Sequence, residues 1–334
     1  MSPVAWRTPP RQYGAWETIA SNITEGLVEA GWDVTLFATG DSITKAKLHA
    51  IIPRGYEEDK SVDPKVAEYL HLSEVFDRAH EFDLIHSHLD FMALTYSHLI
   101  KTPLLTTIHG FSSPKIMPVY EKYHDNYFVS ISDSDRQEGL NYLGTVYNGI
   151  DLTLHDFHEK GGDTLVFLGR IHPDKGTHLA IEVAKRSHRK LVIAGIIQDE
   201  AYFKEKVAPE IDGKHIVYIG PVGAREINEL FREAYALLHL NTIPERFGLV
   251  LVEAGAGGVP VIAMDKGSCR EVISEGVTGF LVCDVEGAVK SLDRIPELDR
   301  NQCRKRVEDH FSLPVMVSQY EKIYQKIFDL EKES

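Results

Sequence analysis

The sequence predicts an α/β protein made of two doubly wound domains, and three observations support this fold class. Short apolar segments alternate with amphipathic segments in both halves of the chain, as strands and helices do in such domains. The strand-like segments of the second half are continuous runs rich in Val, Ile and Leu, which strands buried on both faces of a parallel sheet require. The length of 334 residues fits about two domains.

The first half contains strand-like runs separated by helix candidates. A helix is expected from Trp16 to Leu27, where apolar residues recur at helical spacing, and Gly31 supplies its C-terminal stop. Only the short segment 2–6 precedes the first loop, so the first strand of this domain is expected to be short. The other expected strands are 33–38, 83–86, 103–108 and 127–131.

The second half repeats the alternation after a polar, glycine-containing stretch, and it ends in a helix. Apolar residues after Ser312 recur at spacings of three and four, which predicts a terminal helix with one apolar stripe. The expected domains are 1–147 and 148–311, followed by the helix in 312–334. The expected strands are 164–168, 190–194, 215–219, 235–240, 259–263 and 279–282, and the apolar stripe consists of Met316, Tyr320, Ile323 and Ile327.

Composition excludes several classes of function. The formal net charge of −14 argues against nucleic acid as a partner, because phosphate backbones need a Lys/Arg footprint. The three cysteines form no CxxC pair, which suits a reducing cytoplasm and gives no disulfide framework or zinc site. No signal peptide is visible, and the most apolar window, 247–264, is too polar and short for a bilayer span. A cytoplasmic protein without an integral membrane span is expected.

Ligands of doubly wound sheets bind outside the carboxyl ends of the strands, so the residues that follow each strand are site candidates. The first strand of the second domain is followed by the segment GRIHPDKG, which opens a helix. Arg170 and Lys175, beside a helix N-terminus, suit a diphosphate, although a solvated basic loop is the alternative. No GxGxxG follows the first strand of either domain, which argues against a dinucleotide dehydrogenase.

Two carboxylates follow the fourth strand of the second domain. Glu245 and Glu253 are eight residues apart, and they face one crevice if Glu253 lies in a helix and Glu245 in the loop before it. Such carboxylates accept hydrogen bonds from sugar hydroxyls. Each glutamate alone fits a surface position, but the neighbouring glycines, which allow close backbone approach, favour a site.

These motifs together resemble those of the family-4 glycosyltransferases, which have the GT-B fold. The second half carries GRIHPDKG, GPVGAREINELF, PERFGLVLVEAGAGGVPVIA and VTGFLV, and its two glutamates separated by seven residues are the family's most specific motif. The first half carries PPRQYGAWE, DLIHSHLDF, TTIHGF, VSISDSDR and VYNGID in the family's order. The resemblance covers nearly the whole chain. It implies two Rossmann-like domains facing a central cleft, with the C-terminal helix returning to the N-terminal domain.

The resemblance also implies which residues bind a nucleotide-sugar donor. Arg170 and Lys175 would hold the diphosphate, and Glu253 the ribose hydroxyls. Glu245 would contact the donor sugar together with backbone amides. The remaining donor-binding residues are Gly14 in the loop facing the phosphate, Val222 near the base, and Phe247, Gly248 and Leu249 near the sugar.

Catalytic and acceptor-side residues follow from the same resemblance. His109 would lie beside the reacting carbon and would act with Glu245, Arg170 and Lys175. On the acceptor side the matching residues are Tyr13, His88 and Asp90. The YGAWE loop and the compact length resemble small bacterial members of antibiotic-sugar and polysaccharide pathways.

The expected reaction transfers a hexosyl group, with retention at the anomeric carbon, from a nucleoside diphosphate sugar to a hydroxyl of a sugar-containing or small-molecule acceptor. UDP is the first choice of nucleotide and GDP-mannose the second. No obligatory cofactor or metal is expected, since fixed cations can stabilise the leaving diphosphate. The oligomeric state is not readable from the sequence.

Three alternatives stay open at this stage. A non-catalytic binding protein of the same fold is suggested by Ala15, where the family usually has a second glycine, and by the short first strand. The segment HSHLD, with His86, His88 and Asp90, suggests a metal-dependent hydrolase. Sugar-nucleotide 2-epimerases and glycogen phosphorylases share the architecture and are minor alternatives.

Overall fold

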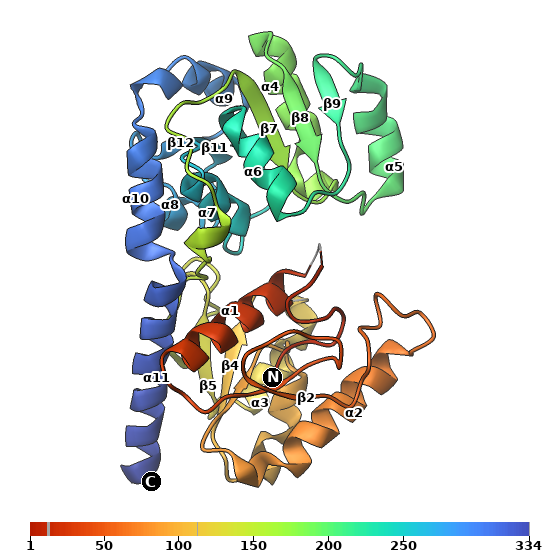
Figure 1. Cartoon of the computed structure of the whole chain (residues 1–334), viewed down its shortest axis with the longest axis vertical. Coiled ribbons are helices and arrows are strands. Elements are labelled where there is room, and N and C mark those ends of the chain that lie inside the picture. The colour runs from red at the N-terminus through yellow and green to blue at the C-terminus, as the bar shows by residue number, and fades with distance from the viewer. Residues whose placement is uncertain (12–13, 112, 334) are drawn as a thin grey trace. The chain divides into compact units, whose positions relative to one another are not determined.

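The computed structural model describes residues 1–11, 14–111 and 113–333. It divides into two compact units. The first unit consists of Met1–Gly149 together with Leu313–Ser334, so the end of the chain folds with its beginning, and the second consists of Ile150–Ser312. Each unit contains parallel β-structure flanked by helices (Figure 1). The prediction of an α/β chain with two doubly wound units is therefore confirmed.

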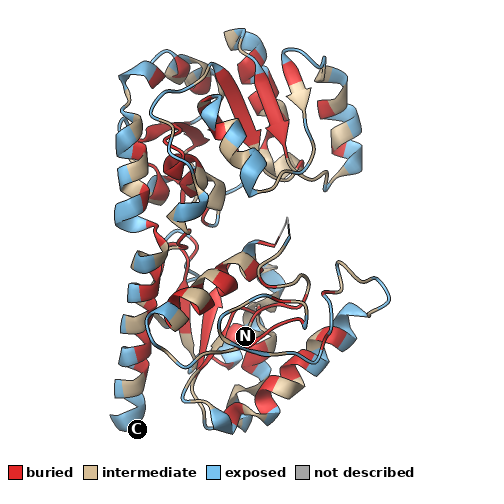
Figure 2. Ribbon diagram, in the orientation of Figure 1, coloured by how far each residue is buried: buried red, intermediate tan, exposed pale blue. Residues whose placement is uncertain are grey.

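Residues 150–312, all of which are described, form one six-stranded parallel sheet with the strand order β12-β11-β10-β7-β8-β9. The chain order reverses between β7 and β10, and α/β sheets bind ligands beyond the carboxyl ends of strands at such a switch point. The central strands are buried, as Figure 2 shows for the red arrows of this sheet. The strands are β7 (Thr164–Leu168), β8 (Leu191–Ala194), β9 (Ile216–Tyr218), β10 (Ala234–His239), β11 (Val261–Met264) and β12 (Gly279–Val282).

The helices of this unit alternate with its strands. Helix α4 buries Ala180, Ile181, Val183 and Ala184 on one face, and these side chains join the main core beneath the sheet. The helices are α4 (Thr177–Ser187), α5 (Glu200–Tyr202) continued by a π-helical turn η6 (Phe203–Val207), α6 (Ala224–Arg232), α7 (Leu249–Ala256), α8 (Cys269–Val272), α9 (Val285–Leu292) and α10 (Arg300–His310).

Among the described residues of the first unit, strands pair in two sheets. One is a pair, β1-β2, and the other has four strands in the order β3-β4-β5-β6, all parallel. The strands are β1 (Thr35–Phe37), β2 (Lys47–His49), β3 (Ile85–Ser87), β4 (Leu104–Ile108), β5 (Tyr127–Ser130) and β6 (Tyr142–Thr145).

The first residues of the chain occupy the place between these two sheets. The amide of Ser2 donates to the carbonyl of Phe37 in β1 at 2.9 Å, and the amide of His88 donates to the carbonyl of Met1 at 3.1 Å. Pro3 has no amide hydrogen, so the ladder cannot continue through it. The segment 2–6, expected as a short strand, is thus bonded like a central strand only at its start, and residues 4–6 form bends. It produces a second switch point, between this segment and β3.

The helices of the first unit include the last helix of the chain. Helix α11 buries the stripe Met316, Tyr320, Ile323 and Ile327, which confirms the predicted apolar face. It packs closely on α1, because a Cβ on Gly26 would meet Val317 at 2.4 Å. Among the described residues of this unit, the α-helices are α1 (Ala15–Glu29), α2 (Pro64–Asp77), α3 (Met117–Lys122) and α11 (Leu313–Glu333), and 3₁₀ segments such as η2 (Met92–Leu99) lie between them.

Strand positions agree with the sequence prediction where strands are buried. Strands β7 and β12 have the predicted bounds, and the other predicted strands differ by at most two residues at either end. Strands β2 and β6 were not predicted. Both lie at sheet edges and are only partly buried, so they lack the continuous apolar run that marks the central strands.

Candidate functional site

The candidate site of the second unit lies at its switch point. The loop after β7 carries Arg170 and Lys175, and the residues at the end of β10 and beyond carry His239, Asn241 and Glu245. Because β7 and β10 are neighbours in a parallel sheet, both loops leave the same edge. The structure therefore brings Lys175 and Glu245, seventy residues apart in the chain, into direct contact.

Glu245 is the centre of this cluster. Its Oε2 accepts hydrogen bonds from the Lys175 ammonium at 2.6 Å, from His239 Nε2 at 2.9 Å and from the Asn241 amide. The Glu245 side chain is only 9% exposed. Burial alone would raise the pKa of Glu245, but the hydrogen bond and charge of His239 and the charge of Lys175 bring this pKa well below its ordinary value. The carboxylate is therefore ionised and held in place at physiological pH.

Two glycines let the backbone come close enough to build the cluster. Gly176 has φ 67°, and a Cβ there would meet the carbonyl oxygen of Leu240 at 2.0 Å. Gly267 has φ 61°, and a Cβ there would meet the carbonyl oxygen of Glu245 at 2.2 Å. Next to Gly176, the amide of Thr242 donates to the carbonyl of Asp174 at 2.9 Å. These approaches fix Lys175 and Glu245 against each other.

We expect Gly176→Ala to disrupt this cluster. The new Cβ cannot fit beside Leu240, so the variant should lose more than about 2 kcal/mol of stability and place Lys175 away from Glu245. Gly213→Ala is the matched control, because Gly213 has a similar φ of 71° and nothing within 4 Å of its Cβ position. The control should lose about 1–2 kcal/mol from the left-handed backbone alone. Equal destabilisation in urea melts of both variants would contradict the proposed clash.

Arg170 is not part of the Glu245 cluster. Its guanidinium donates to Gln198, in the loop that follows β8. Val222 lies in the loop between β9 and α6. The loops that carry Arg170 and Val222 leave the same edge of the sheet as the loop that carries Lys175. Within residues 150–312, all of which are described, no hydrogen bond joins Arg170 or Val222 to Glu245 or Lys175.

The segment after Glu245 leads into helix α7. Phe247 is buried and packs edge-on against Phe311, with ring centroids 6.0 Å apart. Gly248 has φ 82° and precedes Leu249, the first residue of α7. Glu253 lies in α7 and Glu245 in the loop before it, as the sequence predicted. The amides at the start of α7 therefore follow directly on the Glu245 cluster.

Glu253 is partly buried, and no described residue makes a hydrogen bond or ion pair with its carboxyl group. Burial raises its pKa to about 7. A ligand hydroxyl that donates to this carboxylate would replace the water that burial removes. Glu253 therefore has the character expected of a ligand-binding carboxylate.

We expect Glu253→Gln to be more stable than the wild type at pH 8 and equally stable near pH 4.5. The folded-state pKa of about 7 lies above the ordinary value of 4.5, so the folded wild type binds more protons than the unfolded chain between these values. Wild-type stability therefore falls as pH rises through this range, on the order of 1–3 kcal/mol, and the amide has no such dependence. Thermal melts at both pH values measure the difference, and parallel curves for the two proteins would contradict the raised pKa.

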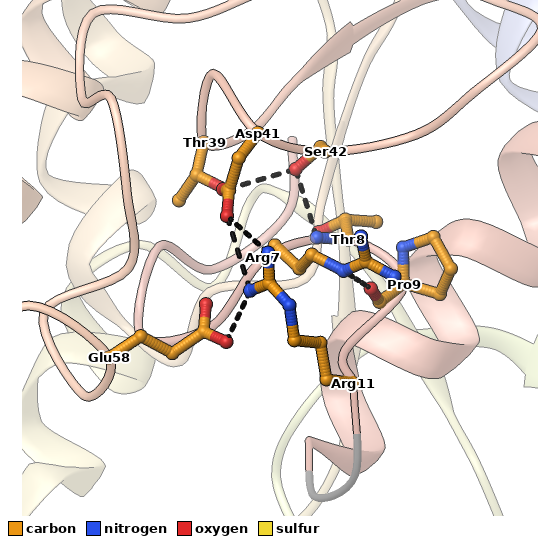
Figure 3. Close-up of polar contacts among 8 residues, drawn as sticks. All are labelled: Arg7, Thr8, Pro9, Arg11, Thr39, Asp41, Ser42 and Glu58. Carbon is orange, nitrogen blue, oxygen red and sulfur yellow. Dashed lines mark hydrogen bonds and ion pairs between the residues drawn. The ribbon is translucent and has the colours of Figure 1, made fainter.

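In the first unit, the loop that follows the initial segment is held by polar contacts (Figure 3). The amide of Thr8 donates to Ser42 Oγ at 2.9 Å, and Arg7 Nε donates to the carbonyl of Pro9 at 2.9 Å. Arg11 pairs with Glu58 at 2.6 Å and with Asp41 at 3.3 Å. The loop is thereby attached to the segment after β1. Tyr13, predicted on the acceptor side, lies outside the described residues.

Gly14 ends this loop and begins helix α1. It has φ 147°, and a Cβ there would lie 2.9 Å from Pro10 and 3.0 Å from Glu17. Ala15, by contrast, is an exposed first residue of α1. Its methyl group is therefore exposed rather than packed inside the protein.

His109 and His88 lie in direct contact beyond the ends of β4 and β3. His88 Nδ1 and His109 Nε2 are 3.0 Å apart, and the ring of Trp16 stacks on His109 with centroids 5.5 Å apart. Both histidines are buried, at 3% and 8% exposure. Asp90 accepts a hydrogen bond from the hydroxyl of Tyr120 at 2.9 Å. The structure thus brings His88 and His109 together and attaches Asp90 to the core.

The contacts of His86 argue against the alternative of a metal-dependent hydrolase. The ring nitrogens of His86 are bonded to the hydroxyls of Tyr324, at 2.8 Å, and Thr107, at 2.7 Å. Among residues 1–11, 14–111 and 113–333, no three His, Cys, Asp or Glu side chains are grouped to hold a metal ion. The parallel sheets also differ from the antiparallel layers that such hydrolases have.

Sequence reasoning did not select His239, Asn241 and Trp16, which contact the predicted site residues Glu245 and His109. Asn241 directly follows the predicted strand 235–240, so the same rule that selected Glu245 could have selected it, whereas His239 lies inside that predicted strand. Trp16 was counted only as an apolar helix residue, and nothing in the sequence marks its contact with His109.

Comparison with known proteins agrees with this fold. The family model "Glycosyltransferase Family 4" matches residues 16–154, and "Glycosyl transferases group 1" matches residues 155–309. The chain is 24% identical to an uncharacterized glycosyltransferase of Methanocaldococcus jannaschii over 84% of each protein. It is 29% identical to a phosphatidyl-myo-inositol mannosyltransferase of Mycolicibacterium smegmatis, over 66% of this chain and 64% of that protein.

The solved structures share the architecture. Anabaena HepE, in a crystal structure with UDP and glucose, superposes with a TM-score of 0.72 over 93% of this chain and 96% of HepE, at 19% identity. No helix in the described part of the chain combines the length and apolar character needed to cross a membrane. The two family models together account for residues 16–309. The chain thus belongs to the family-4 glycosyltransferases of GT-B fold, retaining enzymes that use a nucleotide-sugar donor.

Proposed function

We propose that this enzyme transfers a hexosyl group from a UDP-sugar to a hydroxyl of a sugar-containing or small-molecule acceptor, with GDP-mannose as the second candidate donor. The observation that carries the proposal is the ionised Glu245 held by Lys175 and His239 at the switch point of the second unit. UDP in the HepE crystal structure supports the first donor, and the mycobacterial mannosyltransferase supports the second.

Each donor group has a matching residue in this proposal. Lys175 carries three ammonium hydrogens, so it can keep its bond to Glu245 and still donate to a phosphate oxygen. Arg170, on the same edge, supplies the second cation to the diphosphate. Glu253 accepts from the ribose hydroxyls. Glu245 accepts hydrogen bonds from hydroxyls of the hexose. Backbone amides near Gly248 and Leu249, at the start of α7, donate hydrogen bonds to the same hexose.

The chemical step follows from where charge develops. The bond between the anomeric carbon and the diphosphate breaks, and the diphosphate oxygen gains negative charge. Lys175 and Arg170 stabilise this charge more strongly in the transition state than in the bound donor. The acceptor oxygen then bonds to the anomeric carbon from the face that the diphosphate leaves, which preserves configuration. The acceptor proton passes to the departing diphosphate.

On the other unit, we assign His109 to the position beside the reacting carbon. Its ring is buried between Trp16 and His88, so it has a fixed plane. We assign Gly14 to contact with the donor phosphate and Asp90 to the acceptor side.

A donor panel tests the function. Binding stabilises the folded protein, and a ligand at 100 times its Kd adds about 2.7 kcal/mol. UDP-hexoses should raise the melting temperature more than GDP-mannose or ADP-sugars at equal concentration. Release of UDP, followed with and without glycoside acceptors, then measures transfer and hydrolysis. A shift with ADP-sugars alone, or no turnover of any donor that binds, would overturn the proposal.

We also expect activity to persist in EDTA. Lys175 and Arg170 stabilise the negative charge on the diphosphate, which a divalent metal ion stabilises in other glycosyltransferases. Turnover should stay within about twofold of the untreated enzyme after dialysis against chelator. If EDTA abolishes turnover and Mg²⁺ or Mn²⁺ restores it, a metal ion rather than these two side chains stabilises the diphosphate.

A further inference from the structure

A row of polar side chains lies on one face of β3 and β4 in the first unit. Side chains alternate between the faces of a strand, so His86 and His88 share a face, as do Thr107 and His109. The two strands are parallel neighbours, with Ser87 opposite Thr106. This register places His86 diagonally against Thr107 and His88 diagonally against His109.

Each diagonal pair is joined by a hydrogen bond. His86 Nε2 and Thr107 Oγ1 are 2.7 Å apart, and His88 Nδ1 and His109 Nε2 are 3.0 Å apart. The rings of His86 and His88 are also in contact, with centroids 4.3 Å apart. His109 is thus the outer end of a row that continues inward from the strand ends.

The inner end of the row is anchored by helix α11. Tyr324 bonds to His86 Nδ1 at 2.8 Å, and Tyr320 bonds to Thr107 Oγ1 at 2.9 Å. Both ring nitrogens of His86 are therefore occupied, and its ring plane is fixed. The ring of His86 packs against the ring of His88 and takes no part in the bond between His88 and His109.

Burial keeps the histidines of this row neutral. It lowers the pKa of His109 to about 3 and the pKa of His88 and His86 well below the ordinary value. A bond between two neutral imidazoles contains one hydrogen. If His88 Nδ1 donates, His109 Nε2 is the acceptor and His109 must carry its hydrogen on Nδ1. If His109 Nε2 donates, its Nδ1 has a lone pair.

We propose that His88 is a positioning residue for His109. The bond between His88 Nδ1 and His109 Nε2 fixes the ring plane of His109 and couples the tautomers of the two rings. It leaves Nδ1 of His109 as the nitrogen presented to the transferred sugar. This inference rests on the proposed role of His109. It gives His88 a function through His109 rather than through contact with the acceptor, which agrees with the burial of His88. Trp16, stacked on the other side, restricts the same ring.

The coupling makes a specific spectroscopic prediction. In ¹⁵N spectra of histidine-labelled enzyme, His88 and His109 must carry the same tautomer, either both Nδ1–H or both Nε2–H. Signals are assigned by their loss in His88→Asn and His109→Asn. Opposite tautomers on the two rings, or a protonated ring at neutral pH, would overturn the proposal.

Kinetics of two His88 variants test the positioning role. Asn places an amide atom where Nδ1 stood and can donate to or accept from His109, whereas Leu has a similar volume and no such atom. His88→Leu should lower kcat by about tenfold to a hundredfold with little change in donor KM, and His88→Asn should recover most of this loss. In the Leu variant the His109 signals should also change tautomer or broaden.

His86→Leu is the matched control. It disturbs the same buried face and removes the bonds to Tyr324 and Thr107, but it leaves the bond between His88 and His109. Its kcat should stay within about threefold of wild type, with thermal melts recorded for all variants. An equal loss in His86→Leu and His88→Leu would assign the effect to packing and overturn the proposal.

A further variant separates this inference from the function on which it rests. If His109→Ala keeps wild-type kcat, the assigned role of His109 is wrong. If His109→Ala is inactive while His88→Leu is fully active with an unchanged His109 spectrum, His109 keeps its role and the positioning by His88 is wrong.

Discussion

Lys175→Ala is expected to lower kcat/KM by about 100-fold or more, the largest effect that the structure predicts for a single side chain. Removing one charge contact to a transition state typically costs ~2.7 kcal/mol or more. Lys175 is 20% exposed and lies 2.6 Å from a carboxylate that is itself buried, so its ammonium is held in place rather than mobile in solvent. Lys175→Arg should recover only part of the activity, because a planar guanidinium does not occupy the same point.

The control for this prediction lies on the helix that follows Lys175. Lys185 in α4 is 57% exposed and pairs with Glu210 on the surface, so Lys185→Ala should leave kcat/KM unchanged. Arg170→Ala should resemble Lys175→Ala, with Arg225→Ala on the exposed side of α6 as its control. If Lys175→Ala and Arg170→Ala both stay within threefold of wild type while remaining folded, the diphosphate contacts are wrongly assigned.

The second large effect separates the two glutamates of the motif. Glu253→Gln should weaken binding of free UDP and of donor to the same extent, because ribose does not change during transfer. Glu245→Gln should lower kcat by about 100-fold and reduce selectivity among donor sugars, since a site built to bond a hydroxyl penalises its absence. Its affinity for free UDP should be retained or increased. The reason is that Lys175, released from the carboxylate, has its full charge available for the diphosphate.

Calorimetry with free UDP, beside steady-state kinetics, decides between these roles. Thermal melts must accompany the Glu245 variant, because its carboxylate accepts from Lys175, His239 and Asn241 at once and its loss also affects folding. Glu275→Gln is a control of the same chemistry in the same unit, at an exposed carboxylate outside the cluster. An equal loss of UDP affinity in Glu245→Gln and Glu253→Gln would show that the roles are not divided in this way.

Much of the fold follows from local patterns. The runs 164–168 and 279–282 are continuous and apolar, and both became strands with the predicted bounds. The stripe that begins at Met316 has helical spacing and is buried in α11. Such patterns are readable because burial selects apolar side chains at the period of the element. Strands β2 and β6 were missed because edge strands are under weaker selection of this kind.

The candidate site was predictable as a set of residue types but not as a set of contacts. The rule that ligands bind beyond strand ends selected Arg170, Lys175 and Glu245 without any structure, and the family resemblance added His109. It did not indicate that Lys175 is bonded to Glu245 while Arg170 is bonded to Gln198. It also did not indicate that His88 Nδ1 is bonded to His109 Nε2.

The sequence by itself therefore determined the fold class, the order of the elements and the loops that carry the chemistry, since each depends on residues close together in the chain. Tertiary structure alone decided which of these loops touch and which atoms pair. Lys175 and Glu245 meet because β7 and β10 are neighbours and because Gly176 and Gly267 leave no Cβ between the loops. His88 and His109 meet through the register of β3 and β4. Strand order and register are fixed only when segments distant in the chain pair, so neither can be read from the residues of one strand alone.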